Sequence, residues 1–311
     1  MPPVMTIEPT NICNLRCPLC TTGSGQMERV KGTMSLDTFK LLLDNFGNDI
    51  FFMLIYHQGE PYINPHFFDF VKLAKAKKIY VTTSTNGHYF NEKTIEATIA
   101  SGLDSMIVSV DGITQDSYQK YRIRGELDKV ISGTKKMMKM RKIRGSRTPN
   151  IALQFLVMKH NEHEIPALRE LAEELGVDRL LIKNIEVHSK QEANEWLPVN
   201  ENFRRYNFNG KELIVKGSEK NSCTRPWLST LVNWDGEVVP CCFDKNGKYP
   251  MGNITNGASG TDIWFGAPLT SFRKKLLANR KSIDICRNCN QGFGSFLPKN
   301  LWRNNHRKPQ T

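Results

Sequence analysis

The sequence has no long apolar run. Nothing in its 311 residues approaches the roughly eighteen consecutive apolar residues that a membrane helix requires. Its first residues, Met-Pro-Pro-Val-Met-Thr, have neither the basic start nor the apolar stretch of a signal peptide. No internal repeat or low-complexity tract is present. We therefore expect a cytoplasmic globular protein with one large domain, or one large and one small domain.

Acidic residues are scarce beside basic ones, 31 against 43, which gives a net charge of +12. Seven of the basic residues lie late in a predicted helix: Lys135, Lys136, Lys139, Arg141, Lys142, Arg144 and Arg147. The simplest interpretation is a solvated helix end whose cations oppose the negative pole of the helix dipole. The alternative is attraction for anionic partners. No recognition helix or aromatic ribonucleoprotein stretch accompanies the charge, so we do not expect nucleic acid to be a partner.

Cysteine is present but unevenly spread, and three of the eight fall in one loop. Cys13, Cys17 and Cys20 form the pattern C-x3-C-x2-C directly after the apolar segment Val4–Ile7. Three thiolates suit a cubane iron–sulfur cluster, which normally takes four ligands. The missing ligand leaves one iron open to a substrate or cofactor. A structural zinc site would need a fourth protein ligand, and the residues next to the loop are threonines.

The run Cys13-Asn-Leu-Arg-Cys17-Pro-Leu-Cys20 resembles the signature of radical S-adenosylmethionine (SAM) enzymes. The resemblance implies that SAM chelates the open iron. An electron from the 4Fe–4S cluster then cleaves SAM into methionine and a 5′-deoxyadenosyl radical, which abstracts hydrogen from a substrate. It also implies an electron donor of the flavodoxin or ferredoxin type. Zinc or purely structural cysteines remain the alternative.

The first 185 residues alternate between strand-like and helix-like segments. The six strand-like runs are Val4–Ile7, Phe51–Ile55, Tyr80–Thr83, Met106–Val110, Ile151–Val157 and Arg179–Ile182. Helical spacing lies between them, and Gly176 marks the end of one predicted helix. Repeated strand–helix units predict an α/β protein with a parallel sheet. The family resemblance implies a partial (β/α)6 barrel.

Several segments after the predicted strands resemble the SAM-binding motifs of that family. His57-Gln-Gly59-Glu60-Pro61 resembles the Gly-Gly-Glu-Pro motif that contacts the SAM amino group, with Gln58 in place of the first glycine. Ser84-Thr85-Asn86-Gly87 resembles the segment near the SAM methionine and ribose. Ordinary turns are the alternative in both cases.

The fourth predicted strand leads to a further group of expected SAM contacts. Ser109 ends that strand, and Arg122 resembles the arginine that pairs with the SAM carboxylate. A guanidinium suits that role because it forms two parallel charge-assisted hydrogen bonds. Arg124 competes for the assignment. Asn161 and Glu164 resemble a helix start after the fifth strand, where local capping is an equal alternative.

A second cysteine set lies near the C-terminus. Cys223, twelve residues, Gly236, four residues and Cys241 match the first half of the SPASM motif of radical SAM maturases. Cys286 and Cys289 add a C-x2-C pair. The four would hold a fully ligated auxiliary 4Fe–4S cluster, and a zinc ribbon is the alternative.

Two details of this set affect the expected cluster. The later positions of the full motif hold Ser295 and Lys299, so the chain resembles the one-cluster "twitch" version. Its spacing is similar to that of the aminocyclitol dehydrogenase of butirosin biosynthesis. Cys242 follows Cys241 directly, and neighbouring strand residues point to opposite faces. We therefore favour Cys241 as the ligand.

These patterns predict a domain order. We expect a radical SAM barrel at 1–185, a bridge at 186–222, a twitch/SPASM-like domain at 223–295 and a basic tail at 296–311. The small domain should contain a β-hairpin around Asp235-Gly236 and a helix near Pro268–Asn279.

The resemblance favours an oxidoreductase, a dehydrogenase acting on a small hydroxylated substrate such as a sugar or aminocyclitol. The auxiliary cluster would accept the second electron. The sequence does not choose a proton acceptor among Tyr56, His57, Lys183 and His188. The alternatives are a SPASM-type peptide maturase and an epimerase in which a thiol such as Cys242 returns hydrogen. A zinc-stabilised nucleic-acid-binding protein is a different class that fits the motifs poorly.

Overall fold

The computed structural model describes residues 1–216, 221 and 223–289, together with the backbone of 301–303. The chain divides into two compact units. Unit 1 comprises Met1–Thr83 and Val215–Gly294, and unit 2 comprises Ser84–Ile214 and Ser295–Thr311. Ser295, Lys299 and the side chains of the expected basic tail lie outside the described residues. The predicted boundaries at 185, 222 and 295 stay predictions. Each compact unit combines segments that are far apart in the sequence, so the units do not test these boundaries.

The sheet of unit 1 joins the N-terminal strands to the C-terminal segment. Its strands are β1 (Val4–Ile7), β2 (Phe52–Ile55), β3 (Tyr80–Thr85), β9 (Ser229–Val232), β10 (Glu237–Val239) and β11 (Gly252–Asn253). Their order is β11-β10-β9-β1-β2-β3. Strand β1 runs parallel to both β2 and β9, so that Val4 faces Phe52 on one side and Ser229 on the other. The loops that carry both cysteine sets therefore start from one sheet.

The predicted hairpin and helix of the C-terminal segment are present. Strands β9 and β10 pair antiparallel around Asp235-Gly236, and Gly236 has a φ of 84°, which explains why glycine stands in this turn. The predicted helix is α10 (Ala267–Asn279), preceded by α9 (Gly260–Phe265). The short helix α8 (Arg225–Leu228) begins two residues after Cys223, and the short helix α11 (Asp284–Arg287) contains Cys286.

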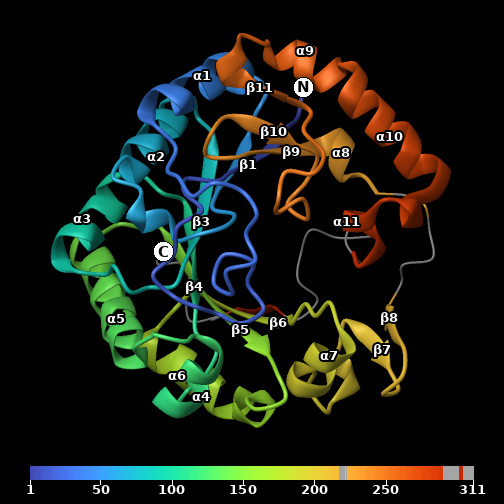
Figure 1. Cartoon of the computed structure of the whole chain (residues 1–311). Helices are drawn as coiled ribbons and strands as arrows, with labels where there is room; N and C mark the ends of the chain where they lie inside the picture. Colours follow the sequence, from blue (N-terminus) through green and yellow to red (C-terminus); the bar gives the residue numbers. More distant parts are fainter. Residues whose placement is uncertain (217–220, 222, 290–300, 304–311) are drawn as a thin grey trace. The chain divides into compact units, whose positions relative to one another are not determined.

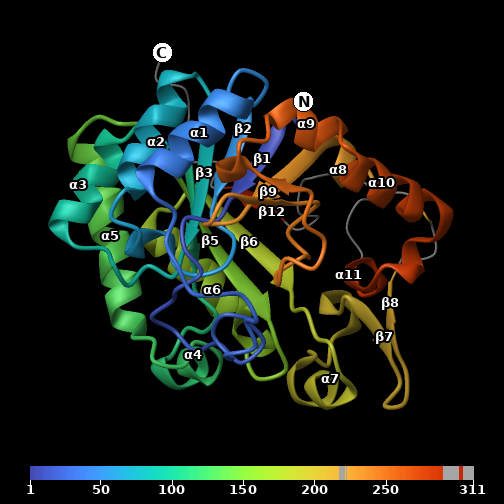
Figure 2. The same cartoon turned by 45° about the horizontal axis from the view of Figure 1, so that its top comes forward.

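Two amphipathic helices follow β1 and β2 in unit 1. Helix α1 (Leu36–Phe46) begins at Ser35, whose side chain accepts a hydrogen bond from the Thr38 backbone N–H. Its apolar face packs on α2 (Phe67–Ala76), and the rings of Phe39 and Phe70 stack with centroids 4.3 Å apart. The two helices lie side by side, with α9 next to α1 (Figures 1 and 2).

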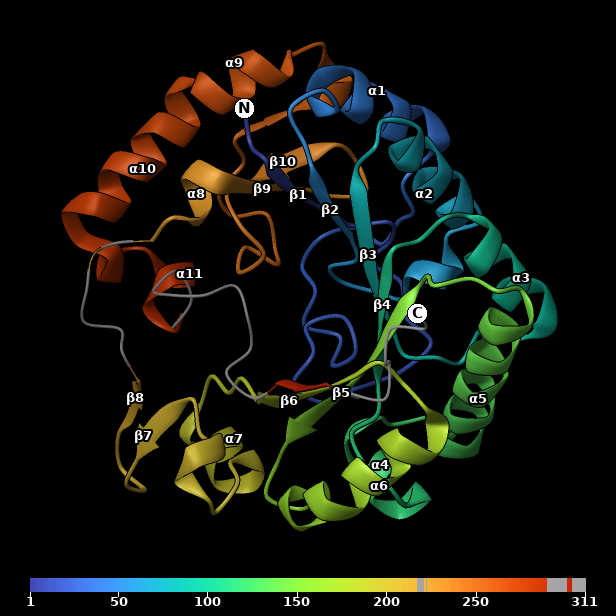
Figure 3. The ribbon, with the colours of Figure 1, turned by 180° about the vertical axis from the view of Figure 1, so that it is seen from behind.

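Unit 2 repeats the strand–helix alternation. Parallel strands β4 (Ser105–Ser109), β5 (Asn150–Val157) and β6 (Arg179–Asn184) are accompanied by helices α3, α4, α5 and α6, at Glu92–Ala100, Gln115–Tyr121, Leu127–Ile143 and Ile165–Leu175. Helices α3 and α5 lie side by side (Figure 3). Gly176 ends α6 with a φ of 67°, as its position predicted.

Beyond β6, unit 2 contains smaller elements. These are α7 (Lys190–Trp196), the two-stranded pair β7 (Tyr206–Phe208) and β8 (Leu213–Val215), and β12 (Leu301–Arg303), which pairs antiparallel with β6. Among the described residues, no helix is long and apolar enough to cross a membrane.

The cationic end of α5 is partly neutralised within unit 2. Arg141 is 7% exposed, and its Nη1 donates to the Pro149 carbonyl at 2.7 Å and to the Asp178 carboxylate at 2.5 Å. Arg144 and Lys135 form surface ion pairs with glutamates. Part of this charge therefore serves the fold rather than a partner.

Candidate iron–sulfur and SAM sites

The N-terminal cysteine loop starts at the carboxyl end of β1. Cys17 is buried, Cys13 and Cys20 are partly exposed, and none of the three forms a disulfide. The loop is tightly turned, because the Cys20 N–H donates to the Cys17 carbonyl at 3.2 Å and the Ser24 N–H donates to the Cys20 carbonyl at 2.8 Å. A backbone N–H, that of Leu15, points at the Cys13 sulfur at 3.4 Å. Such N–H groups stabilise a thiolate that binds iron.

At Gly59 the backbone of the loop after β2 packs closely against residues 10–12, which lead into the cysteine loop. Its φ is +73°, and a Cβ there would stand 2.4 Å from the Thr10 carbonyl oxygen and 2.7 Å from that of Ile12. The next N–H, from Glu60, donates to the Ile12 carbonyl at 2.9 Å. Glycine is thus required for both conformation and space. The Gly-Glu-Pro segment and the cysteine loop form one local structure.

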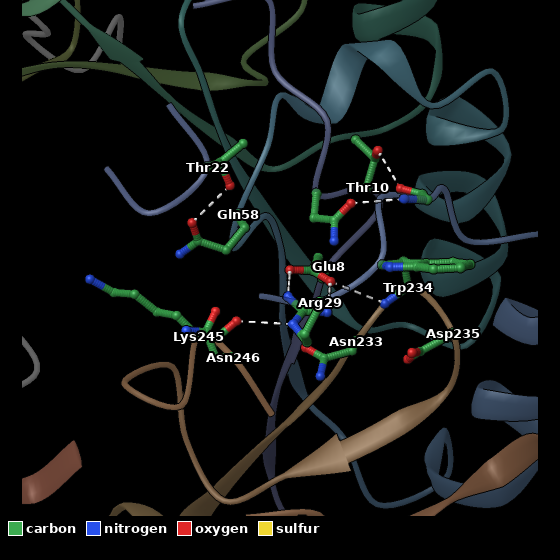
Figure 4. Close-up of polar contacts among 12 residues, drawn as sticks. Glu8, Thr10, Thr22, Arg29, Gln58, Asn233, Trp234, Asp235, Lys245 and Asn246 are labelled. Atoms are coloured by element: carbon green, nitrogen blue, oxygen red, sulfur yellow. Dashed lines mark hydrogen bonds and ion pairs between the residues drawn. The ribbon is translucent and has the colours of Figure 1, made fainter. Parts of the chain in front are cut away.

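Glu60 and Gln58 stand on either side of this glycine. Glu60 is 2% exposed, and its side chain accepts a hydrogen bond from the Tyr62 N–H at 3.3 Å. The Thr22 hydroxyl donates to Gln58 Oε1 at 3.0 Å (Figure 4). The Cys20 sulfur lies 3.9 Å from the same oxygen. The residue that departs from the family pattern therefore contacts the cysteine loop through its side chain.

A buried ion pair anchors the chain that follows the cysteines. Glu8 and Arg29 form two hydrogen bonds, at 2.5 and 2.8 Å, and their side chains are 0% and 10% exposed (Figure 4). Arg29 Nε also donates to the Lys245 carbonyl at 2.9 Å, and the Trp234 N–H donates to Glu8 at 3.3 Å. The Glu8–Arg29 pair thus connects β1, the β9–β10 turn and the loop after Cys242.

The second cysteine set gathers around Arg225 at the start of α8. Arg225 Nη1 donates to the Cys242 sulfur at 3.6 Å. Burial by itself would lower the pKa of Arg225, but the combined attraction of Cys242, Cys241, Cys289 and Cys223 raises it. These four thiols, from segments far apart in the sequence, therefore lie close to one guanidinium.

The strand argument for choosing between Cys241 and Cys242 does not apply here. Strand β10 ends at Val239, and both cysteines lie in the turn that follows. Alternation of side chains across a strand holds only within the strand. The assignment of Cys241 as ligand therefore rests on the motif spacing alone and stays a prediction.

Burial keeps the thiols protonated until a metal binds. Burial raises the pKa of Cys13 and of Cys286 to about 12, and it raises that of Cys241 as well. Without metal these thiols stay protonated at neutral pH, and metal binding releases their protons. Among the residues that the structure describes, no three His, Cys, Asp or Glu side chains converge on a single metal-ion position. A cubane cluster does not require its ligands to converge on one metal-ion position, because each thiolate binds a different iron.

Unit 2 contains the remaining expected SAM contacts, which are Ser84, Asn86, Ser109 and Arg122. Asn86 is 5% exposed, and its Oδ1 accepts from the His88 N–H at 3.1 Å. Ser109 is buried at the end of β4. Arg122 Nε donates to the fully buried Asp111 carboxylate at 2.6 Å, whereas Arg124 is exposed with a φ of 70°. The Asp111 carboxylate therefore orients Arg122, and no such bond to Arg124 is seen among the described residues. Ser84, the second-last residue of β3, is partly exposed.

Asn161 and Glu164 serve the local structure of unit 2. The Asn161 side-chain amide donates to the Asp111 carbonyl at 3.0 Å and its oxygen accepts from the Met158 N–H at 2.7 Å. Glu164 accepts from the Ile113 N–H at 3.1 Å. These bonds join the loops that follow β4 and β5. Neither side chain accepts a capping hydrogen bond at the helix start that follows, so local capping is not the role that these bonds show.

The candidate proton acceptors differ in electrostatic environment. Burial lowers the pKa of His57 to about 3, and Arg29 and Lys245 act in the same direction. His57 Nε2 is buried and has no hydrogen-bond partner among the described residues. Burial raises the pKa of Tyr56 to about 12 and lowers that of Lys183. His188 lies 3.8 Å from Glu186.

Sequence reasoning did not identify Glu8, Arg29 or Arg225 as parts of this site. Each is a charged residue near a cysteine loop or next to a strand end, which is a weak signal by itself. A buried charge is informative only when its partner is known. Gln58 was noted as a departure from the family, but its contact with Thr22 was not foreseen.

The comparison with known families agrees with this arrangement. Residues 7–172 match the family model described as the radical SAM superfamily. Residues 223–290 match the SPASM model, described as an iron–sulfur cluster-binding domain. The first match covers more than half of the chain, and the chain belongs to the radical SAM superfamily. It carries a C-terminal SPASM domain, and the two domains together imply SAM and two 4Fe–4S clusters, one binding SAM and one auxiliary.

Curated relatives match nearly the whole chain at modest identity. The tungsten-containing aldehyde ferredoxin oxidoreductase cofactor-modifying protein of Pyrococcus furiosus is 27% identical over 298 residues, covering 86% of this chain and 82% of the relative. Mycofactocin maturase MftC of Mycobacterium ulcerans is 23% identical over 309 residues, covering 93% and 80%.

Solved structures share the fold. BtrN, in complex with AdoMet and 2-DOIA, has a TM-score of 0.57 at 20% identity and covers 94% of each chain. SuiB of Streptococcus suis bound to S-adenosylmethionine has a TM-score of 0.65 at 14% identity, covering 93% of this chain and 72% of SuiB. The expected radical SAM fold with a C-terminal SPASM domain is confirmed.

Proposed function

We propose that this radical SAM enzyme is an oxidoreductase that dehydrogenates a small hydroxylated substrate, such as a sugar or aminocyclitol. When bound, SAM and its cluster supply the 5′-deoxyadenosyl radical that abstracts hydrogen, and the auxiliary cluster supplies an acceptor for one electron. The observation that carries this proposal is the second thiol set, which gathers around Arg225 in the unit that also holds the N-terminal cysteine loop. Likeness of fold to BtrN, solved with 2-DOIA, supports a small-molecule substrate.

In this proposal the chain holds its cofactors with separate groups of residues. Cys13, Cys17 and Cys20 hold the SAM-binding cluster, while Cys223, Cys241, Cys286 and Cys289 hold the auxiliary one. The SAM contacts are Gly59, Glu60, Ser84, Asn86, Ser109 and Arg122. The hydrogen bond of Arg122 Nε to Asp111 orients the guanidinium, whose planar shape suits two parallel hydrogen bonds to a carboxylate.

The proton released on oxidation needs an acceptor in the protein. Lys183 is the candidate we favour, because burial lowers its pKa and so shifts it toward the neutral amine that can accept a proton. His57 is a weaker base, since its pKa is about 3. A flavodoxin- or ferredoxin-type protein is the proposed electron donor.

The test uses anaerobic holoenzyme with SAM and a low-potential reductant. We would offer 2-DOIA and other aminocyclitols and amino sugars, each deuterated at the carbon that bears the hydroxyl group. The proposal requires deuterium in 5′-deoxyadenosine, together with a ketone formed in equal amount. A product isomeric with the substrate would replace the dehydrogenase by an epimerase.

A peptide substrate is the second candidate. Relatives include mycofactocin maturase MftC and, at 28% identity over 190 residues, the PqqA peptide cyclase of Gluconobacter oxydans. Short peptides encoded beside the gene would be offered under the same conditions. If a peptide loses mass or gains a crosslink while every sugar leaves SAM intact, the maturase function holds and the dehydrogenase is rejected.

A further inference from the structure

Arg225 occupies an unusual position among the auxiliary cysteines. It is the first residue of α8 and stands two residues after Cys223. Its Nη1 donates to the Cys242 sulfur at 3.6 Å. Its strongest attractions are to the cysteine thiols, including Cys241 and Cys289, which come from other segments of unit 1. The structure thus places a cation in contact with Cys242 and close to Cys223, Cys241 and Cys289.

One partner of this cation, Cys242, is the auxiliary cysteine outside the motif spacing. Cys242 lies in the turn after β10, beside the proposed ligand Cys241. Tyr56, which follows β2, lies close enough to Cys242 and Arg225 for both to interact with it electrostatically. The pair therefore lies near the end of β2, where Gln58, Gly59 and Glu60 form the loop against the N-terminal cysteines.

A cation at this position has a definite physical effect on a cluster. A 4Fe–4S cluster with four thiolates is negatively charged, and one-electron reduction adds a further negative charge. Its reduction potential depends on nearby charge and on hydrogen bonds to the sulfurs. Because Arg225 is largely removed from water, its attraction for the reduced cluster is only weakly screened.

We propose that Arg225 is a positioning residue that raises the reduction potential of the auxiliary cluster, and that the Cys242 sulfur holds its guanidinium in place. The effect on the potential depends only on the auxiliary cluster. Its consequence for turnover rests on the proposed dehydrogenase function. There the substrate radical loses one electron and one proton. The electron reduces the auxiliary cluster, which a flavodoxin- or ferredoxin-type protein reoxidises, and the proton goes to the protein base.

The test is an anaerobic redox titration of the holoenzyme followed by electron paramagnetic resonance. Addition of SAM changes the signal of the SAM-binding cluster and so identifies the auxiliary signal. Arg225→Met and Arg225→Gln remove the charge at similar side-chain length. We expect at least a tenfold loss in the equilibrium for electron uptake, equivalent to a shift of about 59 mV to more negative potential for one electron. Arg225→Lys keeps the charge without the fork and should shift less.

Arg273 provides the matched control in the same unit. It is a structural arginine on α10 that donates to the Pro226 and Trp264 carbonyls, both at 3.0 Å. Arg273→Met should leave the auxiliary potential unchanged. Cys242→Ser weakens the anchor of the guanidinium and should shift the potential in the same direction as the charge removals, by less.

Each outcome decides the proposal. Neutral Arg225 variants with full iron content and an unchanged potential would overturn it. Loss of the auxiliary cluster in both neutral variants would also overturn it, because Arg225 would then be needed for assembly. These measurements contain no substrate. A shifted potential in a protein that does not oxidise sugars would therefore reject the proposed function and leave this inference standing.

Discussion

Breaking the buried ion pair between Glu8 and Arg29 should destabilise unit 1 strongly. Arg29→Met removes two hydrogen bonds to a carboxylate that is 0% exposed. It also leaves the Lys245 carbonyl without the Arg29 donor, which lies 2.9 Å away. Removing one partner of a buried pair costs about 3–5 kcal/mol, because the other charge stays buried without compensation. Burial already raises the pKa of Glu8, so this carboxyl is poorly placed to stay ionised alone.

The expected loss converts into a melting temperature. With an unfolding entropy of about 2.1 cal/mol/K per residue, a loss of 3–5 kcal/mol lowers the Tm by about 5–8 °C if the whole chain unfolds together. If unit 1, with roughly 160 residues, unfolds separately, the decrease is about 9–15 °C. Circular dichroism of the anaerobic holoenzyme, at one scan rate for all variants, measures this decrease.

Two comparisons decide whether the ion pair is the cause. Lys40→Met breaks an exposed pair with Asp37, whose N–O distance is 3.4 Å, and should cost less than about 1 kcal/mol. The double variant Glu8→Gln/Arg29→Met should be less destabilised than the sum of its single variants. A decrease for Arg29→Met no larger than that for Lys40→Met, or strict additivity in the double variant, would refute the reasoning.

Four further predictions test the sites. Replacing all three cysteines of the N-terminal loop by alanine should remove about half of the iron and all SAM cleavage; production of 5′-deoxyadenosine by that variant would contradict the assignment. Cys289→Ala should lower product formation much more than 5′-deoxyadenosine formation, whereas equal losses would indicate a structural role. Arg122→Lys should weaken SAM binding with intact iron content, measured by equilibrium dialysis, and the same result for Arg124→Lys alone would move the assignment by two residues. The pKa of His57 is about 3 when folded and about 6.5 when unfolded, so the unfolded chain gains the proton first. Stability should therefore fall below pH 6.5 by at most about 1.4 kcal/mol per pH unit. Between pH 7.5 and 5.5 the Tm of His57→Gln should fall less than that of wild type, and equal decreases would contradict this prediction.

The sequence alone determined the class of this protein. The C-x3-C-x2-C spacing, the alternation of strands and helices and the hairpin at Asp235-Gly236 are local patterns, and local patterns survive in the fold. Gly59 belongs to the same group, because its φ of +73° and its contact with Thr10 are demands that only glycine meets. The expected family and fold were confirmed for these reasons.

Only the tertiary structure decided which charges lie beside the cysteines. Glu8 and Trp234 meet although 226 positions separate them, because β9 pairs with β1. Arg225 reaches Cys242 because β10 ends at Val239 and the chain turns there. Arg122 is distinguished from Arg124 by its bond to Asp111. In each case the outcome depends on the distance between separate segments, which residue spacing along the chain does not encode, and in a low-dielectric interior that distance decides the electrostatic energy.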